Sequence, residues 1–96
     1  MGDIEKTEKL LKALGDKSRL QILNCIQVGV SNPGEIATKL KRHRATIEKH
    51  LRVLLTASLV EKVPSLTQHG QLSIRYKIRD TAKEPLSKIL ENCQNI

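Results

Sequence analysis

Large aromatic side chains are almost absent from this chain of 96 residues. Tyr76 is the only one, because neither phenylalanine nor tryptophan occurs. Proteins that bind single-stranded nucleic acid usually stack its bases on aromatic rings, so this absence disfavours such a target and leaves duplex DNA as the better fit. Leucine, isoleucine and valine supply 28 residues. That is enough for an aliphatic core and argues against intrinsic disorder.

Long apolar runs and a cleavable leader are also missing. No stretch approaches the roughly 18–20 apolar residues of a membrane span. The first residues, Met-Gly-Asp-Ile-Glu-Lys, are polar and mixed in charge, unlike a signal peptide. We therefore expect a cytoplasmic protein with no membrane partner. The length suits a single domain, residues 1–96, and so small a core is expected to gain stability from oligomerisation.

Residues with reactive side chains are few. Cys25 and Cys93 are the only cysteines, and neither has a histidine or carboxylate partner at metal-ligand spacing. We expect free thiols in a reducing compartment, although a disulfide between the two would also fit. Each thiol could pack in the core or act in redox chemistry, and packing is the more common role. Because the histidines are scattered and no nucleophile motif, carboxylate pair or phosphate loop occurs, we predict no enzymatic activity, no metal and no cofactor.

The net charge of +7 comes from the middle of the chain. Residues 1–38 are neutral and residues 84–96 carry −1, whereas residues 39–83 hold eleven lysines and arginines against three acids, a net of +8. A basic segment in a folded domain favours a polyanionic partner, because each neutralised phosphate releases counterions. The alternative is a solvated basic surface that only keeps the protein soluble.

Two helices are expected at the start of the chain. Asp3 would cap the first and Gly15 would end it, while Asp16 or Ser18 would cap the second, which runs to about residue 28. Apolar residues recur at helical spacing in both. The stripe of the first helix comprises Ile4, Leu11 and Leu14. The stripe of the second comprises Leu20, Leu23, Cys25 and Ile26, with Ile22 at its border.

A helix-turn-helix pattern follows. Asn32 and Pro33 have the residue types that start a helix, which would run to about Leu40. Residues 41–43 form a tight polar turn, and a longer basic helix spans about 44–57. Its buried face comprises Ile47, Leu51, Leu54 and Leu55. A short helix, a tight turn and a longer helix in succession are typical of DNA-binding helix-turn-helix units.

A β-hairpin should come next. We predict a strand from Val60 to Val63 that Pro64 ends, a polar loop at 65–72, and a second strand at 73–78. One side of the second strand would carry Ile74, Tyr76 and Ile78. A hairpin after a helix-turn-helix unit is a wing, so the predicted fold is mainly α with a small β-hairpin, the winged helix-turn-helix.

A last helix should begin near Thr81. Pro85 fits only its first turn, because proline lacks the N–H group that a helix interior needs. The apolar stripe of this helix comprises Leu86, Ile89, Leu90 and Cys93.

Two stretches carry a family resemblance. Residues 11–23, LKALGDKSRLQIL, resemble the opening of the ArsR-type winged-helix regulators, and residues 46–54, TIEKHLRVL, resemble their recognition helix. Residues 58–60 are similar to the GLV of these regulators, and Tyr76 matches the aromatic residue that ends their wing. The resemblance covers about residues 8–92 in register.

The resemblance implies a prokaryotic transcriptional regulator that binds double-stranded DNA as a homodimer. The recognition helix would be at about 44–57 and the wing at about 65–72, with helices at 1–15 and 81–96 forming the dimer interface. The interface side chains would be Ile4, Leu11, Leu86, Ile89, Leu90 and Cys93. Alternatively, the terminal helices only cover the core of a monomer. The sequence does not indicate which effector ligand, if any, the protein binds.

The chain departs from the family pattern at several positions. The Cys-x-Cys and Asp/His metal-ligand motifs of many ArsR-type regulators are missing. Glu48 stands where the family usually has a small hydroxyl residue that faces DNA. Ser58 replaces a helix-ending glycine, and Gln71 follows Gly70 where an arginine is common.

The DNA-contacting residues are expected in the turn, the following helix and the wing. The N-terminal part of such a helix meets base edges, so we assign Arg44, Ala45 and Lys49 to bases. Lys41, Arg42 and Arg52 are assigned to phosphates. The remaining candidates are Thr46 (phosphate contact or local cap), His43 (phosphate contact or mere exposure), His69 (phosphate or minor groove at the wing tip) and Arg75.

Two nearby residues and two other functions stay open. Glu48 could accept a hydrogen bond from cytosine N4 or point away, and His50 is expected to have a structural role rather than to contact DNA. The same fold could also serve as a general chromatin-like duplex binder or as a winged-helix protein-interaction module.

Overall fold

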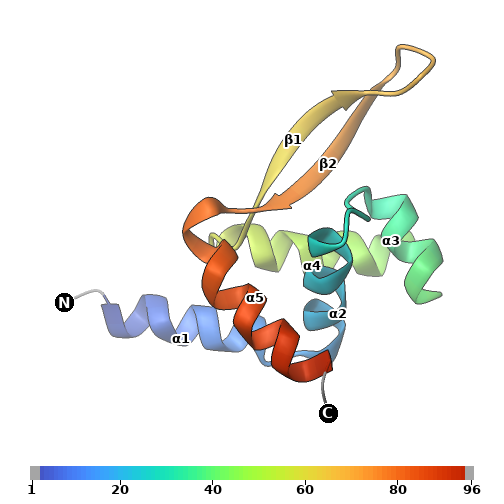
Figure 1. Ribbon diagram of the computed structural model, residues 1–96. Coiled ribbons are helices and arrows are strands. Elements are labelled where there is room, and N and C mark those ends of the chain that lie inside the picture. The colour runs from blue at the N-terminus through green and yellow to red at the C-terminus, as the bar shows by residue number, and fades with distance from the viewer. Residues whose placement is uncertain (1–2, 95–96) are drawn as a thin grey trace.

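The computed structural model describes the backbone of residues 3–94 and the side chains of residues 4–88. Within that range it contains five helices and one antiparallel hairpin (Figure 1). In chain order the elements are α1 (Asp3–Leu14), α2 (Lys17–Gln27), α3 (Pro33–Leu40), α4 (Arg44–Thr56), β1 (Val60–Leu66), β2 (Leu72–Ile78) and α5 (Asp80–Gln94). The predicted winged helix-turn-helix fold is confirmed. None of the helices between residues 3 and 94 combines the length and apolar composition needed to cross a membrane.

Side-chain caps set the starts of α2 and α3. Asp16 Oδ1 accepts hydrogen bonds from the backbone N–H groups of Ser18 and Arg19, at 2.8 and 3.2 Å. Asp16 is therefore the N-cap of α2, and Ser18 lies inside the helix. Asn32 caps α3 in the same way and Pro33 opens it, as the sequence predicts. The predicted cap of α1, Asp3, has a side chain outside the described residues.

The core lies where α2 meets the other elements. α2 contacts α1, α3, α4, α5 and β2, so it buries more than one narrow stripe. For that reason Ile22 is fully buried, although the sequence placed it at the border, while Leu20 is only partly buried. The other fully buried large side chains are Leu23, Ile36, Ile47, Leu51, Leu54 and Val60.

The apolar residues of α1 divide between two faces. Ala13 is buried, and Leu10 and Leu14 pack against the core. Ile4 and Leu11 are 80% and 63% exposed, so only the Leu14 end of the expected stripe packs against this chain's core. The helix touches the body along one side only, and the Ile4–Leu11 side faces away from this chain's core.

The hairpin is longer than the sequence indicated. β1 continues through Pro64, which pairs with Ile74, and the loop is limited to residues 67–71. Pro64 does not end the strand, because each strand of a two-stranded ribbon has a free edge where a missing N–H group costs nothing. The ribbon projects from the helical body (Figure 1), so Tyr76 and Ile78 reach the core whereas Ile74 is 37% exposed.

The last helix differs from the prediction in one detail. α5 begins at Asp80, where the carboxylate pairs with Lys83 at 3.1 Å. Pro85 therefore lies in the second turn and not in the first, and it removes a single backbone hydrogen bond. Leu86 is 2% exposed and packs in the core of this chain. The side chains of Ile89, Leu90 and Cys93 lie outside the described residues.

Candidate nucleic-acid interface

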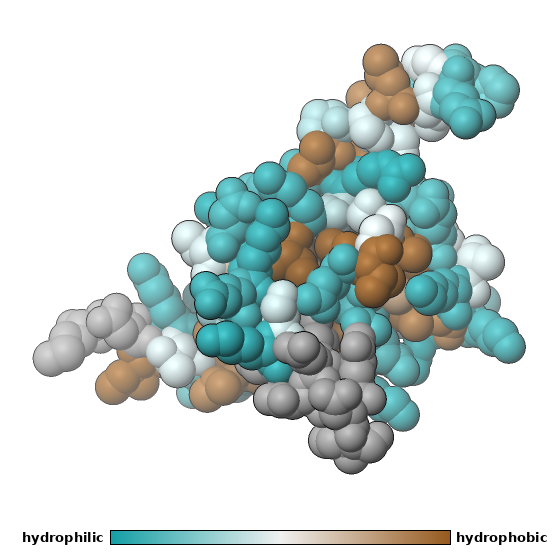
Figure 2. Space-filling view, viewed as in Figure 1, coloured by the Kyte–Doolittle hydropathy of each residue, from teal (hydrophilic) through white to brown (hydrophobic). Residues whose placement is uncertain are grey.

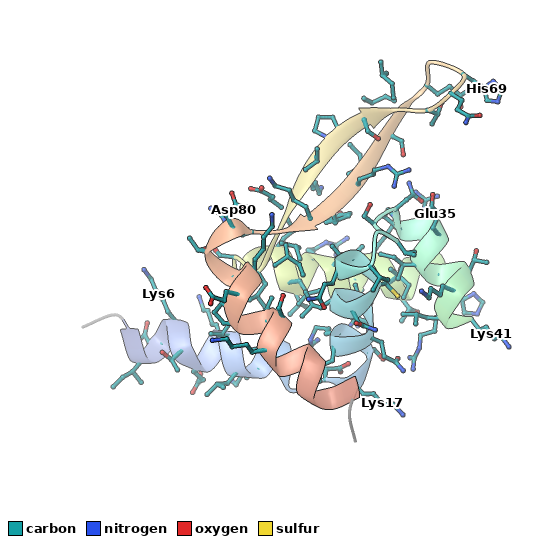
Figure 3. All side chains as sticks on the ribbon, viewed as in Figure 1. Lys6, Lys17, Glu35, Lys41, His69 and Asp80 are labelled. Carbon is teal, nitrogen blue, oxygen red and sulfur yellow. The ribbon has the colours of Figure 1, made fainter. Side chains whose placement is uncertain are left out.

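The turn between α3 and α4 is held by backbone hydrogen bonds. Lys41 adopts the left-handed conformation, with φ 56° and ψ 49°, and its N–H donates to the Thr38 carbonyl. The Arg42 N–H donates to the Ala37 carbonyl at 3.0 Å. These bonds fix the direction in which α4 leaves α3 and keep the side chains of residues 41–43 exposed. Figure 3 shows Lys41 at this corner, far from the wing tip.

His43 occupies the N-cap position of α4 but makes no side-chain capping hydrogen bond. Because the cap position belongs to His43, Thr46 does not cap the helix, and only its phosphate role stays open. The first N–H groups of α4 have no capping side chain, which suits a negatively charged neighbour.

The exposed residues of α4 lie on two flanks. Arg44 and Glu48 line a groove between α4, the start of α3 and the wing. Lys49 and Arg52 line a second groove, between α4 and α1. At about 100° per residue, Lys49 is about 140° around the helix from Arg44, with Ala45 between them. The three residues assigned to bases therefore span most of the exposed face of α4.

The wing-side flank carries an ion pair. Arg44 Nε donates to Glu48 Oε1 at 3.2 Å, and the two side chains are 63% and 46% exposed. Glu48 therefore does not point away from the surface that the sequence assigned to DNA. Glu48 also lies close enough to Tyr76 to influence the pKa of its phenol. Burial raises this pKa and the negative charge of Glu48 raises it further, while the positive charge of Arg52 lowers it.

The basic residues of this surface differ in whether they form ion pairs. Among the described side chains, residues 4–88, no ion pair involves Lys41, Arg42, Lys49 or Arg52, and all four are exposed. Arg75 is different, because it pairs with Glu35 at 3.8 Å and donates to Ser31 Oγ at 3.2 Å. Arg75 thus holds the base of the wing against the start of α3.

Polar contacts that the sequence did not predict reinforce this junction. Asn32 Nδ2 donates to Ser73 Oγ at 3.0 Å, so the residue that caps α3 also binds β2. The Tyr76 N–H donates to the Ser31 carbonyl at 2.9 Å. The wing is therefore fixed to the helix-turn-helix unit by both backbone and side-chain hydrogen bonds. His69 lies at the wing tip, exposed and distant from this junction (Figure 3).

Sequence reasoning also missed the role of Arg19. Its guanidinium donates to the carbonyls of Ala13 and Lys12, at 2.8 and 2.9 Å, and so satisfies the C-terminal end of α1. Its Nη1 lies 3.5 Å from His50 Nδ1. This contact fits the structural role expected for His50 and links α1, α2 and α4 behind the exposed face. The only local signal was an arginine in the first turn of α2.

The next features are the possible metal ligands and the buried thiol of Cys25. Among the described residues no group of three or more His, Cys, Asp or Glu side chains could hold a metal ion. Cys25 is a free thiol, 3% exposed and packed in the core. Burial raises the pKa of this thiol, against a smaller opposing effect of Lys39, so Cys25 is placed as a packing residue.

Known proteins share both the pattern and the fold. Residues 16–62 match the model of the bacterial regulatory proteins of the arsR family. An uncharacterized HTH-type transcriptional regulator of Methanocaldococcus jannaschii is 30% identical over 92 residues, which cover 95% of this chain and 99% of that protein. The chain belongs to the ArsR family. It is a winged helix-turn-helix transcriptional regulator, and α3 and α4 form its helix-turn-helix.

Solved structures of similar proteins agree with the fold of this ArsR-family chain. A homodimeric winged helix-turn-helix DNA-binding domain from Mycobacterium bovis is 26% identical, with a TM-score of 0.74 over 95% of this chain and 77% of that one. An ArsR-like transcriptional regulator from Rhodococcus sp. RHA1 is also 26% identical, with a TM-score of 0.73 over 99% of this chain and 85% of that one.

Proposed function

We propose that this ArsR-family regulator binds double-stranded DNA as a homodimer, with α4 in the major groove and the wing alongside. The observation that carries the proposal is a set of exposed cations on the α3–α4 turn and on α4 that no carboxylate of residues 4–88 neutralises. They are Lys41, Arg42, Lys49 and Arg52. Cations held on a fixed backbone are the expected partners of phosphates.

Each candidate has an assigned role. Arg44, Ala45 and Lys49 contact base edges, while Lys41, Arg42 and Arg52 contact phosphates. His43, Thr46 and His69 add backbone contacts around the turn and at the wing tip. Arg75 sets the angle of the wing through Glu35 and Ser31, and its exposed part can reach a phosphate.

The homodimer would form through the two terminal helices, residues 1–15 and 81–96. Ile4 and Leu11 support it, because both are large, apolar and mostly exposed on α1, and such a patch on a small domain is typical of an interface. The Mycobacterium bovis relative is homodimeric. A two-fold dimer would present two α4 helices about one DNA turn apart, so the preferred site should be a pseudo-palindrome.

Selection of bound duplexes from a random pool tests this function. The expected product is a two-fold symmetric consensus that random DNA does not displace, with affinity that falls steeply as salt is raised. Affinity that random DNA matches would indicate a general duplex binder. No duplex binding at about 50 mM salt would overturn the proposal, since electrostatic attraction is strongest there. We further propose that the protein acts in the cytoplasm and carries out no catalytic step.

A further inference from the structure

Glu48 is the only carboxylate between Ile36 and Val60, a stretch that carries six lysines and arginines. It lies on α4 and accepts a hydrogen bond from Arg44 Nε at 3.2 Å. An exposed ion pair one helical turn apart contributes little to stability. The Arg44–Glu48 pair therefore matters for its location, on the surface proposed to contact DNA, and not for stability.

The surroundings of the pair restrict Arg44. Both side chains line the groove between α4, the start of α3 and the wing, together with Lys62 and Tyr76. A Cβ atom at Gly34 would lie 3.7 Å from Arg44 Nη1, so the guanidinium also reaches the first turn of α3. Arg44 is thus held on one side by a carboxylate and approaches a second helix on the other, which limits its positions.

A carboxylate in this place discriminates among DNA sequences. It can only accept hydrogen bonds, and in the major groove the donors are the amino groups of cytosine N4 and adenine N6. Where a sequence offers such a group, the desolvated charge is compensated. Where the sequence offers no amino group, the negative charge of Glu48 faces only base acceptors and phosphates, and this unfavourable contact opposes binding.

We propose that Glu48 is a specificity-determining residue of this regulator, which positions Arg44 and requires a cytosine or adenine amino group within reach of its carboxylate. This inference rests on the proposed function. Two effects follow. Removing the carboxylate should increase affinity for DNA in general, and it should erase the preference for an amino-bearing base at one position of each half-site.

The test compares Glu48→Ala with Glu61→Ala in the full chain, because alanine removes both the charge and the acceptor. The control removes the same charge from another exposed ion pair, in which Glu61 of β1 lies 3.1 Å from Lys77 of β2. Dissociation constants are measured at one salt concentration on the duplex selected by the wild-type protein and on a scrambled duplex. We expect Glu48→Ala to bind the scrambled duplex more tightly than the wild type does. The ratio of the two dissociation constants should fall about tenfold, which is the size of one base-pair preference.

The control should keep the wild-type ratio. Repeating the selection with Glu48→Ala should yield a consensus in which one C or A position per half-site becomes degenerate. A ratio within about twofold of the wild type, together with an unchanged consensus, would overturn the inference and leave the proposed function intact. Wild-type protein that binds no duplex would overturn both. Because Glu48 is 46% exposed, circular dichroism should show the variant folded as the wild type.

Discussion

At the scale of single residues, the two flanks of α4 should behave differently. Arg44 is oriented by Glu48 beside the wing, whereas Arg52 is exposed and lies in none of the ion pairs of residues 4–88. A side chain whose positions are limited suits the reading of a base edge. A free lysine or arginine suits a phosphate.

The substitutions Arg44→Ala and Arg52→Ala test this division. We expect Arg44→Ala to relax the base preference at one position, at a cost of about 1–3 kcal/mol on the preferred duplex, and Arg52→Ala to weaken all duplexes alike and lower the salt slope by about one. Titrations of selected and scrambled duplexes over a series of salt concentrations measure both effects. Equal losses of preference in the two variants would contradict the assignment.

Asp16 makes a second prediction at this scale, for folding rather than binding. Burial opposes ionisation of Asp16, but the N–H groups of Arg19 and Ser18 and the charge of Arg19 together hold the pKa of its carboxyl below the usual value. Asp16→Ala should therefore lower the free energy of unfolding by about 1 kcal/mol at neutral pH, the usual value of an N-cap. Urea denaturation measures the change.

The effect of Asp16 should depend on pH with a definite sign. Because the pKa is lower in the folded state, the stabilisation is present above the unfolded pKa of about 3.8 and is lost as the pH falls through the folded value. The difference between wild type and Asp16→Ala should thus shrink in acid. Lys17→Ala, at the exposed first position of the same helix, should leave the midpoint unchanged at both pH values.

At the scale of elements, one side chain fastens α1 to the rest of the molecule. Arg19 donates to two carbonyls at the end of α1 and approaches His50 of α4. Lysine cannot reproduce this forked geometry. The attachment of α1, and with it the exposed Ile4–Leu11 surface, therefore depends on one guanidinium.

Arg19→Lys should loosen α1 while leaving the helix-turn-helix unit in place. Amide hydrogen exchange should become about tenfold faster in α1, and the rates in α3 and α4 should change little, because local opening of a terminal helix leaves the core packed. Lys12→Ala, which removes only an exposed ion pair with Glu8, is the matched control and should have little effect. Uniformly faster exchange across the chain would refute a local role for Arg19.

The wing is fixed in a similar way along the middle of β2 and free at its tip. Hydrogen bonds from Asn32, Arg75 and the Tyr76 backbone join it to α3 and to the segment before it. Immediately beyond these contacts, toward the tip, Leu66 and Leu72 pair across the strands and are each more than 70% exposed. Figure 2 shows hydrophobic atoms near the wing tip and along α1.

At the scale of the whole molecule, the protein is elongated, with dimensions of 47 × 33 × 24 Å. α1 and the wing project from a small core, and the basic surface of α4 lies between them (Figure 1). Such a molecule buries only part of its apolar surface by itself, and a second copy over α1 would bury more.

Leu11→Lys tests this association. Leu11 is 63% exposed in the single chain, so the substitution should leave the fold intact but should place a charge in the proposed interface. We expect dimerisation to weaken at least tenfold in sedimentation experiments, and affinity for the palindromic duplex to fall with it. Val28→Lys changes a residue of similar exposure, 58%, at the end of α2 and should leave association unchanged. Unaltered self-association of Leu11→Lys would exclude this face.

The sequence by itself determined the features that depend on neighbours along the chain. The Asn32-Pro33 start of α3, the end of α1 at Gly15 and the order of helices and hairpin all follow from local backbone preferences. Family membership followed from the same local patterns, since the resemblance lay in residues 11–23 and 46–54.

Only the tertiary structure decided which faces are covered and which polar groups meet. Arg19 and His50 are 31 positions apart, and Asn32 and Ser73 are 41 apart. Periodicity fixes which residues share a helix face but not how many neighbours surround it. For that reason Ile22 proved buried and Leu11 exposed. Pro64 proved part of a strand because only the strand pairing shows which edge is free. Contacts between distant segments depend on packing, which no local pattern encodes.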